Sequence, residues 1–259
     1  MPRVLIIGLG KMGRIHAKHL SEMGVPWGFH DPFVPGGVGL DRLGGYTHAI
    51  IATPILTHYD IYRKLDGFPG RILIEKPVVV RPEHLHVLDD PRVFPGMCER
   101  FNPAVEALKS CIRPAEINSM EFCRTSLTGD VVDVGIHDLD LFCHILDLGN
   151  VPESWWDGDV LVANAYGVEG RFAWPVTVER MRTVVATTAS RRIEVDLLAQ
   201  RIDGHQLPFV WPVRRELQSF LYGKRPHATV SHAWLSRNMF NRLGCHTSST
   251  ALSASRPTA

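Results

Sequence analysis

The sequence has no excess of charge of either sign. Its 259 residues include 28 Lys and Arg against 27 Asp and Glu, and no run of basic residues stands out. Proteins that bind nucleic acid neutralise many phosphates and carry a basic patch or stripe for that purpose. We therefore expect no nucleic-acid partner, and a small molecule is the expected ligand.

Long apolar runs are also absent. The purely apolar runs are of strand length, such as those at 4–7 and 78–80, whereas a membrane-spanning helix needs roughly 20 apolar residues. The chain begins MPRVLIIGLGKMG, where glycines interrupt the apolar run that a secretory signal would continue. We expect no membrane partner and a cytoplasmic location.

The cysteines are few, odd in number and contain no CxxC pair, which argues against a disulfide framework and against a zinc site. The thirteen histidines are scattered, and no HExxH motif appears. We therefore expect reduced thiols and no metal. The five cysteines are Cys98, Cys111, Cys123, Cys143 and Cys245.

Residues 1–100 alternate strand-like and helix-like segments. A short β-branched run at 3–7 is followed by three closely spaced glycines and then by a segment of helical spacing that ends at Gly24. Further strands are expected at 27–31, 48–54 and 71–80, with a helix over 54–65. This alternation predicts a Rossmann domain, a doubly wound parallel sheet whose ligands bind at the carboxyl ends of the strands.

The pattern changes near residue 100. A helix is expected from Pro103, followed by the alternating stretches EINSMEFCRTS, DVLVANAYG, ERMRTVVATTA and RRIEVDLLAQRI, which suit an open, largely antiparallel sheet. Two late amphipathic helices, VRRELQSFLYG and HAWLSRNMFNRLG, follow. We expect an α+β substrate-binding domain over 101–245 and a disordered tail over 246–259.

The first glycine cluster, GLGKMG, fits the pattern GxGxxG. A plain tight turn would also explain it, but its position between a strand and a helix favours a dinucleotide site, in which the pyrophosphate lies on the helix N-terminus. Asp31 ends the next strand, where a carboxylate binds ribose hydroxyls and repels a 2′-phosphate. NAD is therefore expected rather than NADP. The residues expected to bind the cofactor here are Gly8, Gly10, Lys11, Met12, Gly13 and Asp31.

One apolar segment, GDVVDVGIHDLDLF at 129–142, carries four aspartates and a histidine. Buried carboxylates need partners. Asp130 as an N-cap and Asp133 in a first helical turn would give a structural explanation. Alternatively, Asp133 and His137 share one helix face, where the carboxylate can orient the imidazole. The local pattern leaves both interpretations open.

The order of the motifs resembles that of the Gfo/Idh/MocA family of NAD(P)-dependent sugar oxidoreductases. The similarity extends to about Leu243. The motifs are GLGKMGRIHAKHL, IATPILTH, EKP, ERFNPAV, DVVDVGIHDLD and PVRRELQSFLYGKRP. RFNPAV is typical of members that resemble UDP-N-acetylglucosamine 3-dehydrogenases, so the expected substrate is a nucleotide-linked amino sugar.

The resemblance implies a Rossmann domain followed by an open-sheet domain, relatives that commonly pair through that sheet as homo-oligomers, and roles for particular residues. Lys76 would lie beside the nicotinamide and the reacting carbon, with Asp133 and His137 as a dyad facing the sugar. The other implied cofactor contacts are Thr53, Pro54 and His58, in a loop under the cofactor, and Glu75 and Pro77, which would hold Lys76.

Oxidation of a secondary alcohol removes a proton as well as a hydride, so the site needs a base. His137 suits that role, with Asp133 fixing its tautomer and Lys76 stabilising negative charge on the oxygen. Lys76 alone could equally be a solvated lysine at a strand end. Asp138 and Asp140 are expected to be structural or exposed.

Three further residues are candidates for substrate contacts: Arg100, Asn102 and Arg124. Arginines beside a sheet also form surface ion pairs, so this assignment stays open. The chain is shorter than typical members of the family, and residues 32–47 are too few and too glycine-rich for a full crossover helix. This weakens the expected adenine pocket.

Two other readings remain. A non-catalytic relative could bind NAD or a sugar nucleotide as a sensor or partner protein, although the presence of Lys76, Asp133 and His137 argues against it. A different two-domain Rossmann reductase, of the biliverdin or imine type, would not need the DxxxH pair.

Overall fold

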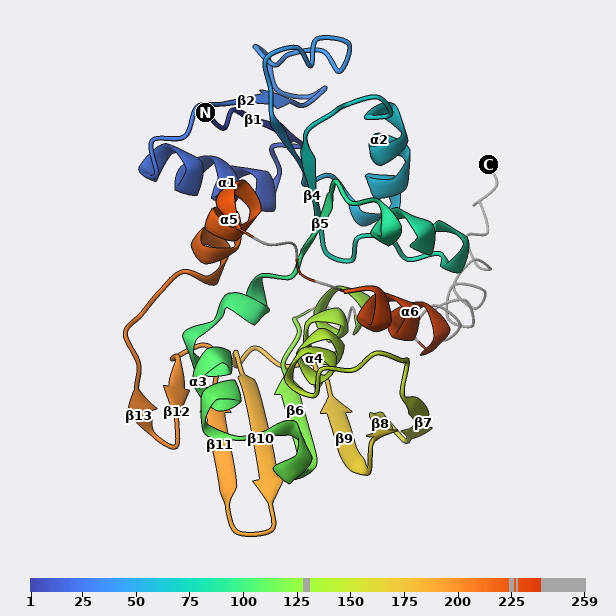
Figure 1. Ribbon diagram of the computed structural model, residues 1–259, viewed down its shortest axis with the longest axis vertical. Helices are drawn as coiled ribbons and strands as arrows, with labels where there is room; N and C mark the ends of the chain where they lie inside the picture. Colours follow the sequence, from blue (N-terminus) through green and yellow to red (C-terminus); the bar gives the residue numbers. More distant parts are fainter. Residues whose placement is uncertain (128–130, 224–225, 227, 239–259) are drawn as a thin grey trace, which may run out of the picture.

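The computed structural model describes residues 1–127, 131–223, 226 and 228–238. Two sheets are stacked end to end along the long axis of the molecule, with helices packed against each (Figure 1). No helix within these described ranges combines the length and the apolar content needed to cross a bilayer.

The first sheet is parallel throughout, in the order β2-β1-β3-β4-β5, which confirms the predicted Rossmann architecture. Its strands are short and mostly buried on both faces, as in other parallel sheets. They are β1 Val4–Ile7, β2 Trp27–His30, β3 His48–Ile51, β4 Arg71–Glu75 and β5 Val93–Gly96.

Alternate strand residues face opposite sides of this sheet, and each side has its own core. Ile6 and Leu73 pack with helices α1 (Lys11–Glu22) and α5 (Pro212–Tyr222), whereas Leu5 and Ile72 lie in a second cluster with residues near α2 (His58–Lys64) and the 3₁₀ helix η2 (Pro82–Asp89). Helix α5 comes from late in the chain, after the strands of the second sheet, yet it covers the first sheet.

The connection from β2 to β3 contains no helix. Turns and irregular backbone fill residues 32–47, as the sequence predicts, and this loop projects beyond the ends of the strands at the top of Figure 1.

The second sheet has eight strands in the order β13-β12-β11-β10-β6-β9-β8-β7. All neighbours are antiparallel except β6 and β9, so the predicted open, largely antiparallel sheet is confirmed. The strands are β6 Ile117–Arg124, β7 Glu153–Asp157, β8 Val160–Ala165, β9 Val168–Ala173, β10 Arg182–Thr188, β11 Arg192–Asp196, β12 Arg201–Ile202 and β13 His205–Gln206.

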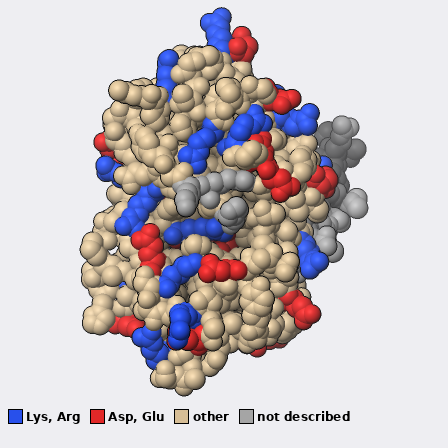
Figure 2. Space-filling model, viewed as in Figure 1, with Lys and Arg blue, Asp and Glu red and all other residues tan. Residues whose placement is uncertain are grey.

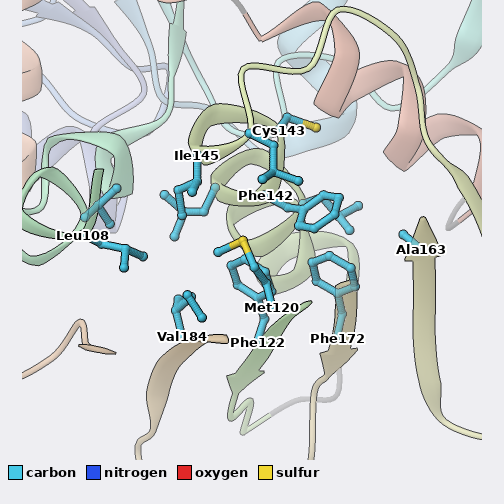
Figure 3. Packing of buried hydrophobic residues seen from close by; sticks show 14 of the residues in the cluster. Leu108, Met120, Phe122, Phe142, Cys143, Ile145, Ala163, Phe172 and Val184 are labelled. Atoms are coloured by element: carbon cyan, nitrogen blue, oxygen red, sulfur yellow. The ribbon is translucent and has the colours of Figure 1, made fainter. Parts of the chain in front are cut away.

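Helix α4 (Val131–Ile145) covers the inner face of this sheet. Its apolar side chains are buried against β6 and β9, and Figure 3 shows Phe142 of α4 beside Phe122 and Phe172 of the strands. The rings of Phe122 and Phe142 are 6.2 Å apart and nearly perpendicular, an arrangement that aromatic pairs favour. This packing fixes α4, and therefore fixes the polar side chains on its other surfaces.

The remaining elements join the two parts. The 3₁₀ helix η1 (Ile55–Thr57) follows β3, and the 3₁₀ helix η3 (Cys98–Phe101) follows β5. Helix α3 (Pro103–Cys111) begins at the predicted proline, and the 3₁₀ helix η4 (Pro114–Glu116) precedes β6. Helix α6 (Thr229–Asn238) packs on α4 and η2. The proposed division at residue 100 stays a prediction, and α5, from the later part, packs on the first sheet.

Candidate active site

The glycine turn after β1 has the geometry that the sequence predicts. Gly8 has a φ of +94°, and a Cβ there would lie 2.8 Å from the Ala52 carbonyl oxygen, so a side chain is excluded. A Cβ on Gly13 would lie 1.9 Å from the Gly8 oxygen, because α1 packs directly on the turn. Gly10, in contrast, faces open space and caps α1 without a side-chain hydrogen bond.

The first turn of α1 is therefore suited to an anion. The N–H groups of Lys11, Met12 and Gly13 begin the helix and have no acceptor within it, and no acidic side chain lies in this turn. Helix N-termini of this kind bind phosphate groups. The residues present fit the pyrophosphate of a dinucleotide.

Asp31 lies beside this turn. Its Oδ2 accepts the Leu9 N–H at 2.7 Å and its Oδ1 accepts the Phe33 N–H at 2.9 Å. These two hydrogen bonds lower the pKa of Asp31 below its usual value, so the carboxyl is anionic at neutral pH. An anion at this position suits ribose hydroxyls and opposes a 2′-phosphate.

His58 connects the loop after β3 to the segment after β4. The ring is buried, with Nδ1 at 2.9 Å from the Pro77 oxygen and Nε2 at 2.9 Å from the Thr53 oxygen. Thr53 and Pro54 are thereby held next to the EKP segment, in which the Lys76-Pro77 peptide is cis. Burial lowers the pKa of His58, although both carbonyl contacts oppose that shift.

Glu75 has a partner that the sequence did not reveal. Nε2 of His16, a fully buried residue of α1, lies 2.6 Å from Oε1 of Glu75. Burial would raise the pKa of Glu75, but the contact with His16 and the charge of Lys76 lower it overall. Gly13 and His16 are three residues apart and therefore lie on one face of α1. This spacing is the only sign in the sequence that His16 would lie near the site.

Lys76 reaches from the first sheet to helix α4. Its Nζ donates to Oδ1 of Asp133 at 2.5 Å and to the Asp133 carbonyl oxygen at 2.8 Å. The lysine side chain is only 14% exposed, whereas that of Asp133 is 56% exposed. The two parts of the chain thus bring together Lys76 and Asp133, two of the residues predicted for one site.

His137 lies one helical turn beyond Asp133. Its ring is buried, and Nδ1 has no hydrogen-bond partner among the described residues. Burial lowers the pKa of His137 well below its usual value, and the positive charges of Lys76, Arg124 and Arg182 lower it further. The imidazole is therefore neutral at neutral pH.

The Asp133 carboxylate is expected to contact His137, but in the structure it binds Lys76 instead. Both residues lie on α4 with the predicted spacing. The ammonium group offers a direct charged partner, whereas the neutral imidazole offers at most an uncharged one.

Arg100 and Asn102 serve the scaffold. Arg100 forms a bidentate pair with the buried Asp140, at 2.5 Å and 2.6 Å. Asn102 caps α3 by accepting the Ala104 N–H at 3.0 Å, and its amide donates to the Leu197 oxygen at 2.9 Å. With these groups already used within the protein, we do not assign either residue to the substrate.

Arg124 is the centre of a buried ion network. Nε donates to Asp138 at 2.9 Å and Nη1 to Glu99 at 3.1 Å, and the side chain is 2% exposed. Trp174 donates to the second oxygen of Asp138 at 2.9 Å. The Arg124 side chain is therefore too buried for the expected contact with the substrate. Asp138 and Asp140 are structural, which is one of the two outcomes expected for them.

Two expectations concern other parts of the site. The N-cap role of Asp130 falls outside the described residues. Within the described ranges, no three His, Cys, Asp or Glu side chains gather as metal ligands would.

Charges of both signs are intermixed over the face seen in Figure 2.

Comparison with known proteins gives matches at the level of structure. No protein-family model and no curated protein sequence matches the chain. The UDP-N-acetylglucosamine 3-dehydrogenase GnnA from Acidithiobacillus ferrooxidans matches with a TM-score of 0.79 at 20% identity, over 93% of this chain and 96% of that chain.

Two further dehydrogenases match over nearly their whole length. MviM from Clostridium difficile has a TM-score of 0.78 at 12% identity, over 95% of this chain and 99% of that chain. WlbA (WbpB) from Thermus thermophilus, solved with NAD and UDP-GlcNAcA, has a TM-score of 0.64 at 17% identity, over 100% of this chain and 97% of that chain. The fold implied by the sequence resemblance is confirmed.

Proposed function

We propose that this chain is an NAD-dependent oxidoreductase that moves a hydride between the nicotinamide ring and a secondary alcohol of a sugar, in particular a nucleotide-linked amino sugar. The observation that carries this proposal is the contact between Lys76 and Asp133, one turn from His137. It joins the carboxyl edge of a Rossmann sheet to the DxxxH helix of a second domain, which is where a cofactor and a substrate would meet.

The cofactor would be held by the glycine turn, by the first turn of α1 and by Asp31. The loop containing Thr53 and Pro54, tied to Pro77 by His58, would form the floor near the ring. When bound, the nicotinamide supplies the hydride acceptor. The anionic Asp31 favours NAD over NADP.

His137 would take the proton of the alcohol. Because Nδ1 is buried without a partner among the described residues, Nε2 is the atom left to accept it. A neutral imidazole has the free lone pair that a base requires. Its protonated form is disfavoured by the surrounding cations, so the proton must pass on or be balanced by a carboxylate.

Lys76 and Asp133 would act as a pair. The ammonium group would stabilise negative charge that develops on the alcohol oxygen, and the carboxylate holds that ammonium group in place. Four residues separate Asp133 from His137, so the same carboxylate can also balance charge on the imidazolium. Glu75 and His16 anchor the strand end from which Lys76 extends.

The substrate class rests on the fold neighbours and on the RFNPAV motif. GnnA is a UDP-N-acetylglucosamine 3-dehydrogenase, and WlbA was solved with UDP-GlcNAcA. Both have this fold over more than nine-tenths of both chains, which supports a nucleotide sugar as substrate here.

The test is to incubate the purified protein with NAD or NADP and a panel of nucleotide sugars, and to record the absorbance of reduced cofactor. We expect turnover with NAD and a UDP-linked amino sugar. Lys76→Ala and His137→Ala should each lower kcat by about 10²-fold or more, with NAD binding retained. Lys18→Ala, which changes an exposed lysine of α1, is the matched control.

Near-wild-type turnover in either site variant would refute the assigned role. Binding of NAD or a sugar nucleotide without turnover on any member of the panel would favour the non-catalytic reading instead.

We also propose that copies of the chain associate through the outer face of the second sheet. α3 and α4 contribute to the core on its inner face, while the outer face carries alternate residues such as Glu121, Trp155 and Arg171, which are exposed or half-buried. Acidic and basic side chains on one face can pair across a two-fold axis. Sedimentation of wild type against Trp155→Glu tests this, since a monomeric wild type would contradict it.

A further inference from the structure

One aromatic side chain near the proposed cofactor site is exposed without a structural reason. Phe33 is 92% exposed, more than any other Phe, Tyr or Trp among the described residues. Single exposed apolar side chains are common on protein surfaces, so what matters is where this one lies. Phe33 lies two residues after Asp31, so its position relative to that site is defined.

The backbone around Phe33 is held firmly. Asp31 and Pro32 open a tight turn, with the Val34 N–H donating to the Asp31 oxygen at 3.3 Å. The Val38 N–H returns the chain to the Phe29 oxygen at 2.8 Å. The ring is therefore presented by a structured turn.

The same carboxylate binds this turn and the glycine turn. Asp31 accepts the Phe33 N–H through one oxygen and the Leu9 N–H through the other. β1 and β2 are neighbours, so Phe33 extends from the end of the strand next to the one that carries the glycines. Asp31 and the two turns thus form one connected unit.

The chemistry of the dinucleotide determines what lies next to Asp31. A carboxylate at this strand end binds the 2′-hydroxyl of the adenosine ribose. The base is attached to the ribose carbon adjacent to the one that carries that hydroxyl. A base bound there lies beyond Asp31 on the side away from the pyrophosphate, and the loop at 32–47, which has no helix, begins at that point.

We propose that Phe33 is the stacking platform for the adenine of the cofactor, in place of a pocket built with a crossover helix. This inference rests on the proposed function, because it assumes that the site binds NAD. Purine faces stack on aromatic rings, and that contact would remove the exposed ring from water.

The test measures binding of NADH, and of reduced nicotinamide mononucleotide, which lacks the adenosine, to wild type and variants by calorimetry. Phe33→Ala should weaken NADH by about tenfold or more, the range found for loss of one base-aromatic stack, and leave the mononucleotide unaffected. Phe33→Tyr keeps the ring and should bind NADH like wild type. Phe209→Ala, which removes another exposed aromatic ring that is 58% exposed, is the matched control and should have no effect.

Unchanged NADH affinity in Phe33→Ala would overturn the proposal, and so would equal weakening of the two ligands, since the loss would then not involve the base. A change in sedimentation with NADH binding intact would assign Phe33 to a protein contact and also overturn it. Failure of wild type to bind any nicotinamide cofactor would refute the proposed function as well, whereas tight NADH binding by wild type with an unaffected variant refutes only the role of Phe33.

Discussion

The ammonium group of Lys76 binds both the carboxylate and the backbone carbonyl of Asp133, at 2.5 Å and 2.8 Å. One side chain of the first sheet is thus attached to the side chain and the main chain of α4. The carboxylate that the sequence associates with His137 is held by a residue 57 positions earlier in the chain.

Asp133→Asn tests this pair, because it keeps the size of the side chain and removes its charge. We expect kcat for alcohol oxidation to fall by about 10²-fold, since Lys76 would lose the carboxylate that its ammonium group binds and a protonated His137 would lose the anion one helical turn away. NAD affinity should stay as in wild type. Asp147→Asn, at an exposed carboxylate that pairs with Lys109, is the control; full activity in Asp133→Asn would show that the charge is not needed.

Acid should destabilise the protein through His137. Burial and the nearby cations lower its folded-state pKa well below 6.5, so between that lowered pKa and about 6.5 the unfolded chain binds a proton that the folded chain does not. Its contribution to stability is complete above pH 6.5 and is lost as the pH falls below it, with a slope of up to about 1.4 kcal/mol per pH unit. Buried His58 and His232 act in the same direction.

The measurement is the Tm of wild type and of His137→Gln between pH 7.5 and 5.5. The variant should lose less stability than wild type over this range. Parallel curves would mean that His137 does not titrate as its surroundings indicate.

Arg100→Met should lower the free energy of unfolding. The variant protein that remains folded should bind substrate with unchanged affinity. The substitution leaves Asp140, which is 1% exposed, without its bidentate partner. Loss of one member of a buried ion pair costs about 3–5 kcal/mol, which denaturant unfolding measures. Arg113→Met is the control and should have little effect, because its arginine is 84% exposed in its ion pair. A raised KM in Arg100→Met with unchanged stability would instead show that Arg100 contacts the substrate.

Glu216→Gln should stabilise the protein at neutral pH. Glu216 is 1% exposed, Oε1 has no hydrogen-bond partner among the described residues, and burial together with the charges of Glu75 and Asp140 raises its pKa well above 4.5. Above pH 4.5 the unfolded chain releases a proton that the folded chain keeps, so wild type loses stability as the pH rises.

A neutral amide avoids that loss. The Tm of Glu216→Gln should therefore exceed that of wild type by about 2 °C or more at pH 7.5, with the difference shrinking toward pH 4.5. Glu83→Gln, at an exposed carboxylate, should match wild type at both values.

Local patterns were sufficient for β1 to β4 of the first sheet and for α3 and α4, whereas β5 (Val93–Gly96) was not predicted. The glycines at 8, 10 and 13 mark a strand-turn-helix step by their backbone requirements alone, and Pro103 begins α3 because its missing N–H is not needed there. The shortened 32–47 segment could be recognised from its length and glycine content. Each of these features depends on neighbours within a few positions in the chain.

Pairings between distant residues could not be found in this way. The spacing of Asp133 and His137 correctly placed both on one helix, but it could not show that Lys76 would bind the carboxylate. Arg100 and Arg124 were candidates for substrate because an arginine in a sequence gives no sign of which carboxylate will be buried beside it. The partner of Glu75, His16, was likewise settled by the way α1 packs on the sheet.

The position of α5 has a consequence for how the molecule can be divided. Leu217 and Phe220 of this helix belong to the same core as Val4, Ile50 and Phe94. A fragment that ends at residue 100 would keep the nucleotide-binding strands but leave that apolar surface in water, and it would be prone to aggregate rather than fold. The half that would bind the cofactor depends on residues translated after the half that would bind the sugar, so neither part can be excised with a single cut.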